Sequence, residues 1–355
     1  MKLDYRYFEI EEILGESPSN DHSPIVSVAF DSRRIVNGEG ILFFALSGNF
    51  RDGHDFIPDA YDRGVRHFVV ERAGSSLTLE GAHEIVVDNV LKSLQRLARH
   101  HRLRFPCPVI GITGSNGKTT VKEWLSHLLQ KKWNVARSPK SYNSQLGVAI
   151  SLLEINADTE VAVIEAGISA PGEMNSLHEM IQATHGIFSS FGMAHRENFE
   201  SPETHLAEKL VLFKDLDSIL IPEALASLQL EKAQLVNKKD YLDLLDLPTF
   251  KESVQVQNAA LAIKMAEILG LDRESIRQGL QELHPLTMRL ESYDGIMGNS
   301  IINDTYSLDL DSLRISLEYQ LSEAKGKERV LVLGLTEKHP EKENELRRLA
   351  QTFAP

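Results

Sequence analysis

The sequence has almost no cysteine and no long apolar run. Its single cysteine, Cys107, excludes a disulfide within the chain and a zinc site built from cysteines. No apolar run reaches the roughly 18 residues that a membrane-spanning helix needs. The opening stretch MKLDYRYFEIEEILGE contains no apolar core of signal-peptide length. We therefore expect a cytoplasmic location and no membrane partner.

Basic clusters are also missing. The formal net charge is −13 at pH 7, and Lys and Arg form no continuous block. A nucleic-acid partner is not expected, because phosphate backbones require clustered positive side chains. An acidic protein that handles phosphate must instead concentrate positive potential locally, in a loop or with a metal ion.

The alternation of apolar and helical patterns predicts an α/β fold with a central parallel sheet. Residues 109–113, 161–165 and 186–190 read as strands, and residues 118–131 and 202–214 read as helices between or after them. Such alternation indicates a parallel sheet covered on both faces.

The chain length suits two or three domains, and the segment Phe105-Pro-Cys-Pro108 breaks the preceding helix. We expect three α/β units, over residues 1–104, 105–289 and 290–355. In the last unit we expect strands around 300–303 and 329–333, and then one charged helix.

A glycine loop follows the strand at 109–113 and has the chemistry of a phosphate-binding P-loop. It is a short form, Thr-Gly-x-x-Gly-Lys-Thr, because Ile112 stands where the standard motif has its first glycine. Its glycines let backbone N–H groups turn around an anion, and the following helix points its positive end at the same place. The alternative is an ordinary turn between strand and helix. The residues expected to bind nucleotide are Gly114, Ser115, Asn116, Gly117, Lys118, Thr119 and Thr120.

A carboxylate near this loop is placed to bind Mg²⁺. Glu165 ends an apolar strand, and the carboxyl edge of a parallel sheet faces the ligand crevice. The alternative is a strand-end acid in solvent. On their own, His195 reads as a surface histidine and Lys209 as a solvated lysine.

Taken together, these segments resemble the Mur ligase family, ATP-dependent amide-forming enzymes of peptidoglycan precursor synthesis. The resemblance runs through most of the chain. The segments that carry it are Asp31-Ser-Arg33, 40–48, Asp52-Gly-His54, 113–120, 138–143, Glu165-Ala-Gly167, Ala194-His195 with Lys209, 258–262, Arg289-Leu-Glu291, 303–306 and Asp311-Ser312.

The resemblance implies a role for each matching residue. Catalytic roles fall to Lys118, His195 and Lys209, and Lys209 becomes carbamylated. Further nucleotide contacts fall to Asn258, Arg289 and Asp304. The UDP-substrate is bound by Asp31, Ser32, Arg33, Ser47, Asp52, His54, Tyr142 and Asn143. Magnesium is held by Thr119, Glu165, His195 and Lys209. The implied cofactors are therefore ATP and Mg²⁺.

Within the family, the segments 31–33 and 303–312 look most like members that add D-alanyl-D-alanine to UDP-N-acetylmuramoyl-tripeptide, including forms fused to an alanine racemase. The sequence departs from the family at Val254-Gln255, where relatives usually show His-Asn. The central domain is shorter than usual, and the C-terminal domain is expected to be incomplete. We therefore expect residues 1–355 to bind UDP-substrate and Mg-nucleotide but to ligate slowly or not at all.

Two other functions stay open at this stage. One is a related ligase for a different amino acid, of the diaminopimelate-adding or folylpolyglutamate type. The other is a nucleotide-binding protein that no longer turns over. We expect a monomer or weak dimer.

Overall fold

The computed structural model describes residues 3–48, 50–75, 79–192, 198–245, 253–324, 326, 328–334 and 340–353. The chain forms two compact units. Unit 1 comprises Met1–Gly111, Trp133–Ala166 and Gly172–Thr184, and unit 2 comprises Ile112–Lys132, Gly167–Pro171 and His185–Pro355. The three domains expected from the sequence stay a prediction, because the two units are defined by their compactness and do not test the domain boundaries.

Unit 1 contains a four-stranded parallel sheet in the order β3-β4-β5-β6. The strands are β3 (Ser27–Ala29), β4 (Ile41–Phe44), β5 (His67–Val70) and β6 (His83–Val86). The connection from β4 to β5 contains α2 (Ile57–Asp62). Ile57 and Ala60 of that helix pack on Phe43 and Phe68 of the sheet, and all four are fully buried. The apolar residues of β4 and β5 therefore form part of the core of this sheet.

The remaining elements of unit 1 include helices that flank its sheets. A short antiparallel pair joins β1 to β2. The bounds are β1 (Tyr5–Arg6), α1 (Tyr7–Leu14), β2 (Pro24–Ile25), α3 (Val90–Leu103), β8 (Val135–Arg137), α5 (Gln145–Leu152), β9 (Val161–Glu165) and α6 (Glu173–Ile181).

The central sheet has the strand order β12-β11-β10-β7-β9-β8. Its pairs β8–β9, β10–β11 and β11–β12 are parallel. The strand β7 (Val109–Thr113) is buried at every position, which explains its continuous apolar sequence. The other bounds are β10 (His185–Phe188), β11 (Ile219–Pro222) and β12 (Ala233–Val236).

Helices of unit 2 pack around the strand ends and the phosphate loop. In α4 (Lys118–Leu129), Val121, Leu125 and Leu128 recur at helical spacing and are fully buried. The other helices are α7 (Pro202–Leu210), α8 (Leu242–Leu245), α9 (Ser253–Ile268) and α10 (Arg273–Gln281). Within the part of the chain that the structure describes, no helix combines the length and apolarity required to cross a bilayer.

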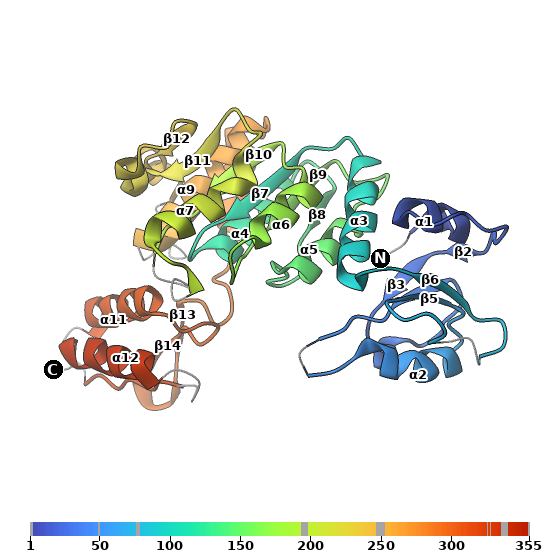
Figure 1. Ribbon diagram of the computed structural model, residues 1–355. Helices are drawn as coiled ribbons and strands as arrows, with labels where there is room; N and C mark the ends of the chain where they lie inside the picture. The colour runs from blue at the N-terminus through green and yellow to red at the C-terminus, as the bar shows by residue number, and fades with distance from the viewer. Residues whose placement is uncertain are drawn as a thin grey trace. The chain divides into compact units, whose positions relative to one another are not determined.

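The last part of unit 2 begins with the antiparallel hairpin β13 (Glu291–Asp294) and β14 (Ser300–Asn303). Two helices follow, α11 (Leu310–Ala324) and α12 (Pro340–Thr352), and they lie side by side (Figure 1). The predicted strand at 329–333 is wrong, because the described residues 328–334 form none. Val330 and Val332 are 73% and 86% exposed. Without a paired neighbour, an apolar run gains no ladder hydrogen bonds.

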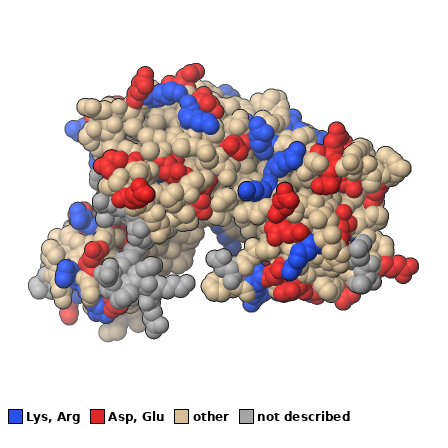
Figure 2. All heavy atoms as spheres, in the orientation of Figure 1, with Lys and Arg blue, Asp and Glu red and all other residues tan. Residues whose placement is uncertain are grey.

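Charged side chains of both signs are interspersed over the face shown in Figure 2, with no continuous basic stripe on that face. This distribution agrees with the net charge of −13.

Candidate active site

The phosphate loop follows β7 directly and turns into α4. Gly114 has φ +144° and Gly117 has φ +83°, values that side-chain-bearing residues rarely adopt. A Cβ at Gly114 would lie 2.3 Å from Ser189 Oγ, and one at Gly117 would lie 2.7 Å from Asn258 Oδ1. Both glycines are therefore required by conformation and by space. The helix begins at Lys118, as the sequence predicts.

Two serines after β10 hold the loop in shape, and sequence reasoning did not single them out. Ser115 N–H donates to the Ser190 carbonyl at 2.9 Å, and Asn116 N–H donates to Ser190 Oγ at 2.7 Å. Ser189 Oγ donates to the Asn116 carbonyl at 2.7 Å. The available signal was position, since both serines are the last residues of the predicted strand 186–190, at the carboxyl edge of the sheet.

Two lysines converge on one carbonyl of the loop. Lys118 Nζ donates to the carbonyls of Gly114 and Ser115, each at 2.9 Å. Lys209 Nζ lies 3.4 Å from the same Gly114 carbonyl and is 2% exposed. Burial, followed by the positive charge of Lys118, lowers the pKa of Lys209 to about 7. Lys209 is thus not the solvated helix lysine that its sequence alone suggests.

Residues near the start of β13 also reach the loop. Arg289 Nη2 donates to Thr119 Oγ1 at 3.1 Å, and the Arg289 guanidinium lies 4.0 Å from the centre of the Tyr306 ring. Asp304 accepts a hydrogen bond from Leu290 N–H at 3.1 Å and another from Ser316 Oγ. Burial raises the pKa of Asp304, which its hydrogen bonds oppose.

A second connection joins the loop to α11. Asn116 Nδ2 donates to Asp309 Oδ1 at 3.3 Å, and Asp309 also accepts the N–H groups of Asp311 and Ser312. Asp309 therefore caps the start of α11 and holds the loop at the same time. The sequence pattern pointed to Asp311 and Ser312 but not to Asp309.

A small pocket adjoins the loop on the side of α9. Its lining includes Asn116, Thr120, Trp124, Gln255, Asn258 and Arg289. Asn258 and Gln255 are 6% and 8% exposed. Gln255, one of the departures from the family pattern, thus lies in the same pocket as Asn258.

In unit 1, Glu165 ends β9 and is 1% exposed. Asn143 Nδ2 donates to Glu165 Oε1 at 2.8 Å, and Glu165 N–H donates to Ser138 Oγ at 3.1 Å. Tyr142 is half-buried in the turn that leads to α5. The structure thus joins the predicted metal acid to one of the predicted substrate residues. Glu165 is not the solvent-exposed acid of the alternative reading.

The predicted substrate residues of the first sheet fall into two groups. Asp31 caps a short 3-10 turn at Ser32–Arg34 and accepts hydrogen bonds from Arg33 N–H at 3.2 Å and Arg33 Nε at 2.8 Å. The Arg33 hydrogen bond lowers the pKa of Asp31. Ser32 is 2% exposed.

The second group surrounds His54. Asp52 Oδ1 lies 2.6 Å from His54 Nδ1, and Glu71 N–H donates to His54 Nε2 at 3.0 Å. Ser47 Oγ donates to Glu71 Oε2 at 3.2 Å. Glu71 therefore links Ser47 to the His54 group. Glu71 was not singled out from the sequence.

His195 lies outside the described residues, so the structure does not place it. Among the described residues, no group of three or more His, Cys, Asp or Glu side chains is arranged to hold a metal ion. The donor set implied by the resemblance contains only one such residue among those described, Glu165, alongside a threonine and a lysine.

The parallel sheet and the glycine loop that leads into α4 define a P-loop α/β protein. A model of the Mur ligase middle domain matches residues 112–240, and a model described as "Mur ligase family, catalytic domain" matches residues 24–102.

Curated relatives extend this match over most of the chain. The UDP-N-acetylmuramoyl-tripeptide–D-alanyl-D-alanine ligase of Synechocystis sp. is 30% identical over 94% of this chain and 77% of its own length. The ligase of the same name from Bacillus subtilis is 30% identical over 90% of this chain and 75% of its own length. The chain belongs to the Mur ligase family. The family resemblance drawn from the sequence is confirmed.

Solved structures agree on the fold. MurF from Acinetobacter baumannii superposes with a TM-score of 0.78 at 22% identity, covering 91% of this chain and 77% of that one. MurF ligase from Thermotoga maritima in complex with ADP gives a TM-score of 0.69 at 23% identity, covering 83% and 74%. The predicted α/β class with a central parallel sheet is therefore confirmed.

Proposed function

We propose that this chain is an ATP-dependent ligase that joins D-alanyl-D-alanine to UDP-N-acetylmuramoyl-tripeptide in peptidoglycan precursor synthesis. The observation that carries the proposal is the phosphate loop with Lys118 and buried Lys209 on one carbonyl, in a chain 30% identical to ligases of that name. Lys118, at the start of the helix that follows the loop, provides the local positive potential that phosphate requires in a protein of net charge −13.

The reaction has two displacement steps. A carboxylate oxygen of the tripeptide attacks the γ-phosphorus of ATP, the bond to the β–γ bridging oxygen breaks, and ADP leaves. The amine of D-alanyl-D-alanine then attacks the acyl carbon of the acyl phosphate, phosphate leaves with the carboxylate oxygen, and the amine gives up a proton. Both steps develop negative charge on oxygen. Lys118 is placed to neutralise that charge at the loop.

Thr119 and Glu165 each carry an oxygen donor of the kind that Mg²⁺ prefers. Mg²⁺ when bound neutralises phosphate charge and orients the reacting oxygens. Thr119 offers a hydroxyl next to Lys118, and Glu165 offers a buried carboxylate whose orientation is fixed by Asn143. The lowered pKa of Lys209 leaves a neutral amine available near neutral pH, and a neutral amine can add CO₂ and lose a proton to form a carbamate. In this proposal Thr119, Glu165, His195 and carbamylated Lys209 are the ligands.

The nucleotide and the UDP-substrate use different parts of the chain in this proposal. ATP contacts residues 114–120, Asn258, Arg289 and Asp304. The UDP-substrate is bound by Asp31, Ser32, Arg33, Ser47, Asp52, His54, Tyr142 and Asn143. The hydrogen-bonded groups around Asp31 and His54 support this second assignment, because they hold polar side chains at the carboxyl ends of parallel strands. A cytoplasmic location and a monomeric or weakly dimeric state complete the proposal.

The test is phosphate release with a panel of amine acceptors. UDP-N-acetylmuramoyl-tripeptide, ATP and Mg²⁺ are supplied with D-alanyl-D-alanine, D-alanine, meso-diaminopimelate or glutamate in turn. We expect D-alanyl-D-alanine to give the highest kcat/KM for phosphate release. A different preferred acceptor would contradict the substrate assignment, and ATP binding with no release for any acceptor would contradict the ligase assignment.

A further inference from the structure

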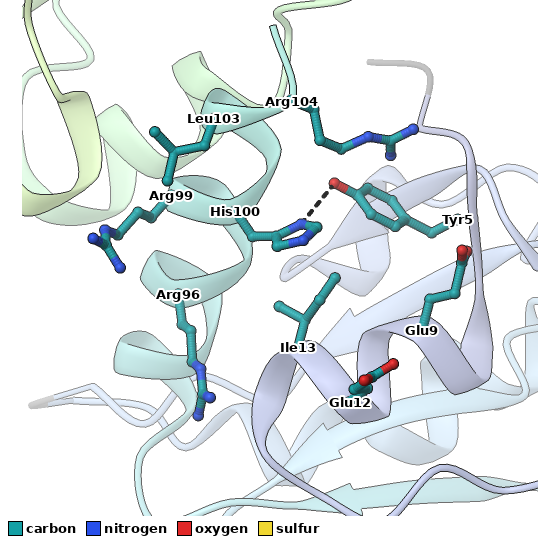
Figure 3. A pocket seen from close by; sticks show the side chains of 9 residues that line it. All are labelled: Tyr5, Glu9, Glu12, Ile13, Arg96, Arg99, His100, Leu103 and Arg104. Carbon is teal, nitrogen blue, oxygen red and sulfur yellow. Dashed lines mark hydrogen bonds between the residues drawn. The ribbon is translucent and has the colours of Figure 1, made fainter.

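A cleft of about 640 Å³ lies in unit 1 between α1 and α3 (Figure 3). None of the residues assigned above to nucleotide, metal or UDP-substrate lines it. Its volume falls within the range of roughly 300–1,000 Å³ that is common for small-molecule sites. The cleft therefore has room for a ligand of its own.

The two walls of the cleft carry opposite charges (Figure 3). The wall formed by α3 and its C-terminal end contributes Arg96, Arg99 and Arg104. The wall formed by α1 contributes Glu9 and Glu12. A ligand that spans the cleft thus meets a positive wall on one side and a negative wall on the other.

Several of these charges are already engaged within the protein. Arg96 Nη1 donates to the Leu14 carbonyl at 3.1 Å, and Arg104 Nη1 donates to the Asp4 carbonyl at 3.2 Å. Glu9 accepts a hydrogen bond from Arg6 N–H at 2.6 Å and so caps α1. The Arg96 contact joins α3 to the C-terminal end of α1.

Two opposite charges remain without such contacts. The side chains of Arg99 and Glu12 make no hydrogen bond or ion pair with any residue that the structure describes. They line the same cleft yet do not come within the 4.0 Å of a salt bridge. Surface charges are often simply solvated, but here an unpaired cation and an unpaired anion belong to facing helices.

The floor between the walls is neutral and partly apolar. The Tyr5 hydroxyl lies 3.5 Å from His100 Nδ1, and burial together with the nearby Arg104 charge lowers the pKa of His100. The lowered pKa favours the neutral imidazole of His100. Ile13 and Leu103 add apolar surface, and Leu103 is 55% exposed. Apolar groups of a ligand would be covered there.

We infer that this cleft binds a zwitterionic ligand of the amino acid or short peptide class. The ligand carboxylate pairs with Arg99, whose planar guanidinium suits two parallel hydrogen bonds. The ligand ammonium pairs with Glu12, and an apolar side chain covers Ile13 and Leu103. A ligand with only one charge satisfies only one wall.

The test uses L-alanyl-L-leucine, its N-acetylated form and its C-terminal amide, with dissociation constants measured by NMR titration. For the wild type, we expect each blocked peptide to bind about tenfold or more weakly than the free one. Arg99→Gln should abolish the preference for a free carboxylate, and Glu12→Gln should abolish the preference for a free ammonium. Lys92→Gln, an exposed change on α3 outside the cleft, is the matched control and should change neither preference.

Each variant is also tested for ATP binding, which reports on folding and on the phosphate loop independently of this cleft. Ten millimolar is roughly the weakest dissociation constant of practical use for a small ligand. The inference is overturned if the wild type binds no free peptide at about 10 mM. Wild-type preferences retained in both Arg99→Gln and Glu12→Gln would also overturn it, because the peptide would then be bound elsewhere. Neither result bears on the proposed ligase reaction.

Discussion

Side chains of like charge lie together at the phosphate loop of unit 2, whereas side chains of opposite charge are paired in the His54 group of unit 1. At the phosphate loop, Lys118 and Lys209 share the Gly114 carbonyl, and the pKa of Lys209 falls to about 7. Around His54, charges are paired, because Asp52 accepts hydrogen bonds from His54 and Arg72. The backbone N–H of His54, followed by its side chain, lowers the pKa of Asp52 to about 2.

The phosphate loop is therefore suited to bind an anion, whereas the side chains of the His54 group already hydrogen-bond to one another. Like charges held together cost stability, and they are relieved when an anionic ligand arrives. Paired charges and closed hydrogen bonds contribute to stability in the ligand-free protein. Mutations at the phosphate loop should therefore affect activity more than stability, and mutations in the His54 group should affect stability more than activity.

The largest effect is expected at Lys118. Lys118→Ala should reduce ATP-dependent phosphate release by about 10³-fold or more, because the ammonium that neutralises transition-state charge is gone. The free energy of unfolding should change little, since this half-buried loop lysine contributes little core packing. Lys131→Ala, which removes a surface pair with Glu282, is the control and should retain turnover. Normal phosphate release by Lys118→Ala would contradict the P-loop assignment.

Substitution of Lys209 should lower activity but raise stability. Lys209→Ala should lose most turnover, and small carboxylic acids added to the assay should partly restore it by occupying the vacated site. Failure of every small carboxylic acid to restore turnover would count against a carbamate at this position.

Removal of the buried amine should also stabilise the metal-free fold. The pKa of Lys209 is about 7 in the fold against a usual value of 10.5, so the unfolded state binds more protons between these values. The stability of the wild type therefore rises with pH through that window. Lys209→Met should raise the free energy of unfolding by roughly 1–3 kcal/mol at pH 7 and below, with the gain shrinking toward pH 10. Denaturant titrations at pH 6, 7 and 9 measure this, and an equal gain at all three would refute the assigned pKa.

Gly114 tests the shape of the loop separately from its charge. Gly114→Ala must place a Cβ 2.3 Å from Ser189 Oγ and 2.9 Å from Ser190 N, so the loop must shift and nucleotide affinity should fall at least tenfold. Gly172→Ala is a matched control, because Gly172 also has a positive φ of +84° but has open space around it. Calorimetry with ATP should find unchanged affinity for Gly172→Ala. Unchanged ATP affinity in Gly114→Ala would contradict the role of the serine contacts in shaping the loop.

The smallest effect on turnover is expected at His54. His54→Ala removes two buried hydrogen bonds and should lower the free energy of unfolding by about 1–3 kcal/mol. UDP-N-acetylmuramoyl-tripeptide should bind the wild type without ATP and bind this variant more weakly, while ATP affinity stays the same. His22→Ala, an exposed change in the same unit, serves as the control. Loss of ATP affinity in His54→Ala would contradict the separation of the two binding regions.

The sequence correctly predicted the features that depend on residues close together in the chain. The strand–glycine–lysine–helix order predicted β7 and the start of α4 at Lys118, and the apolar run at 161–165 predicted β9, because each feature depends on neighbours in the chain. It failed at 329–333, where an apolar run lacks a strand to pair with. The composition of a segment indicates its β-propensity. It does not show whether another strand is present to pair with it, because that strand lies elsewhere in the sequence.

The supporting residues of the site were the harder part to predict. Ser189, Ser190, Asp309 and Glu71 act through hydrogen bonds to residues that are 17 to 193 positions away or on another element. Such residue types are common in turns, so their presence alone carries no signal. The burial of Lys209 was likewise invisible in its helix sequence, and only the family spacing pointed to it.

The central claim is that ligation proceeds through an acyl phosphate made at this loop. It is tested most directly by labelling the reacting carboxylate of UDP-N-acetylmuramoyl-tripeptide with ¹⁸O and supplying ATP, Mg²⁺ and D-alanyl-D-alanine. We expect one labelled oxygen in the inorganic phosphate for each amide bond formed, because phosphate leaves with the carboxylate oxygen that attacked it. Amide formation with unlabelled phosphate, or ATP hydrolysis without amide, would contradict the claim.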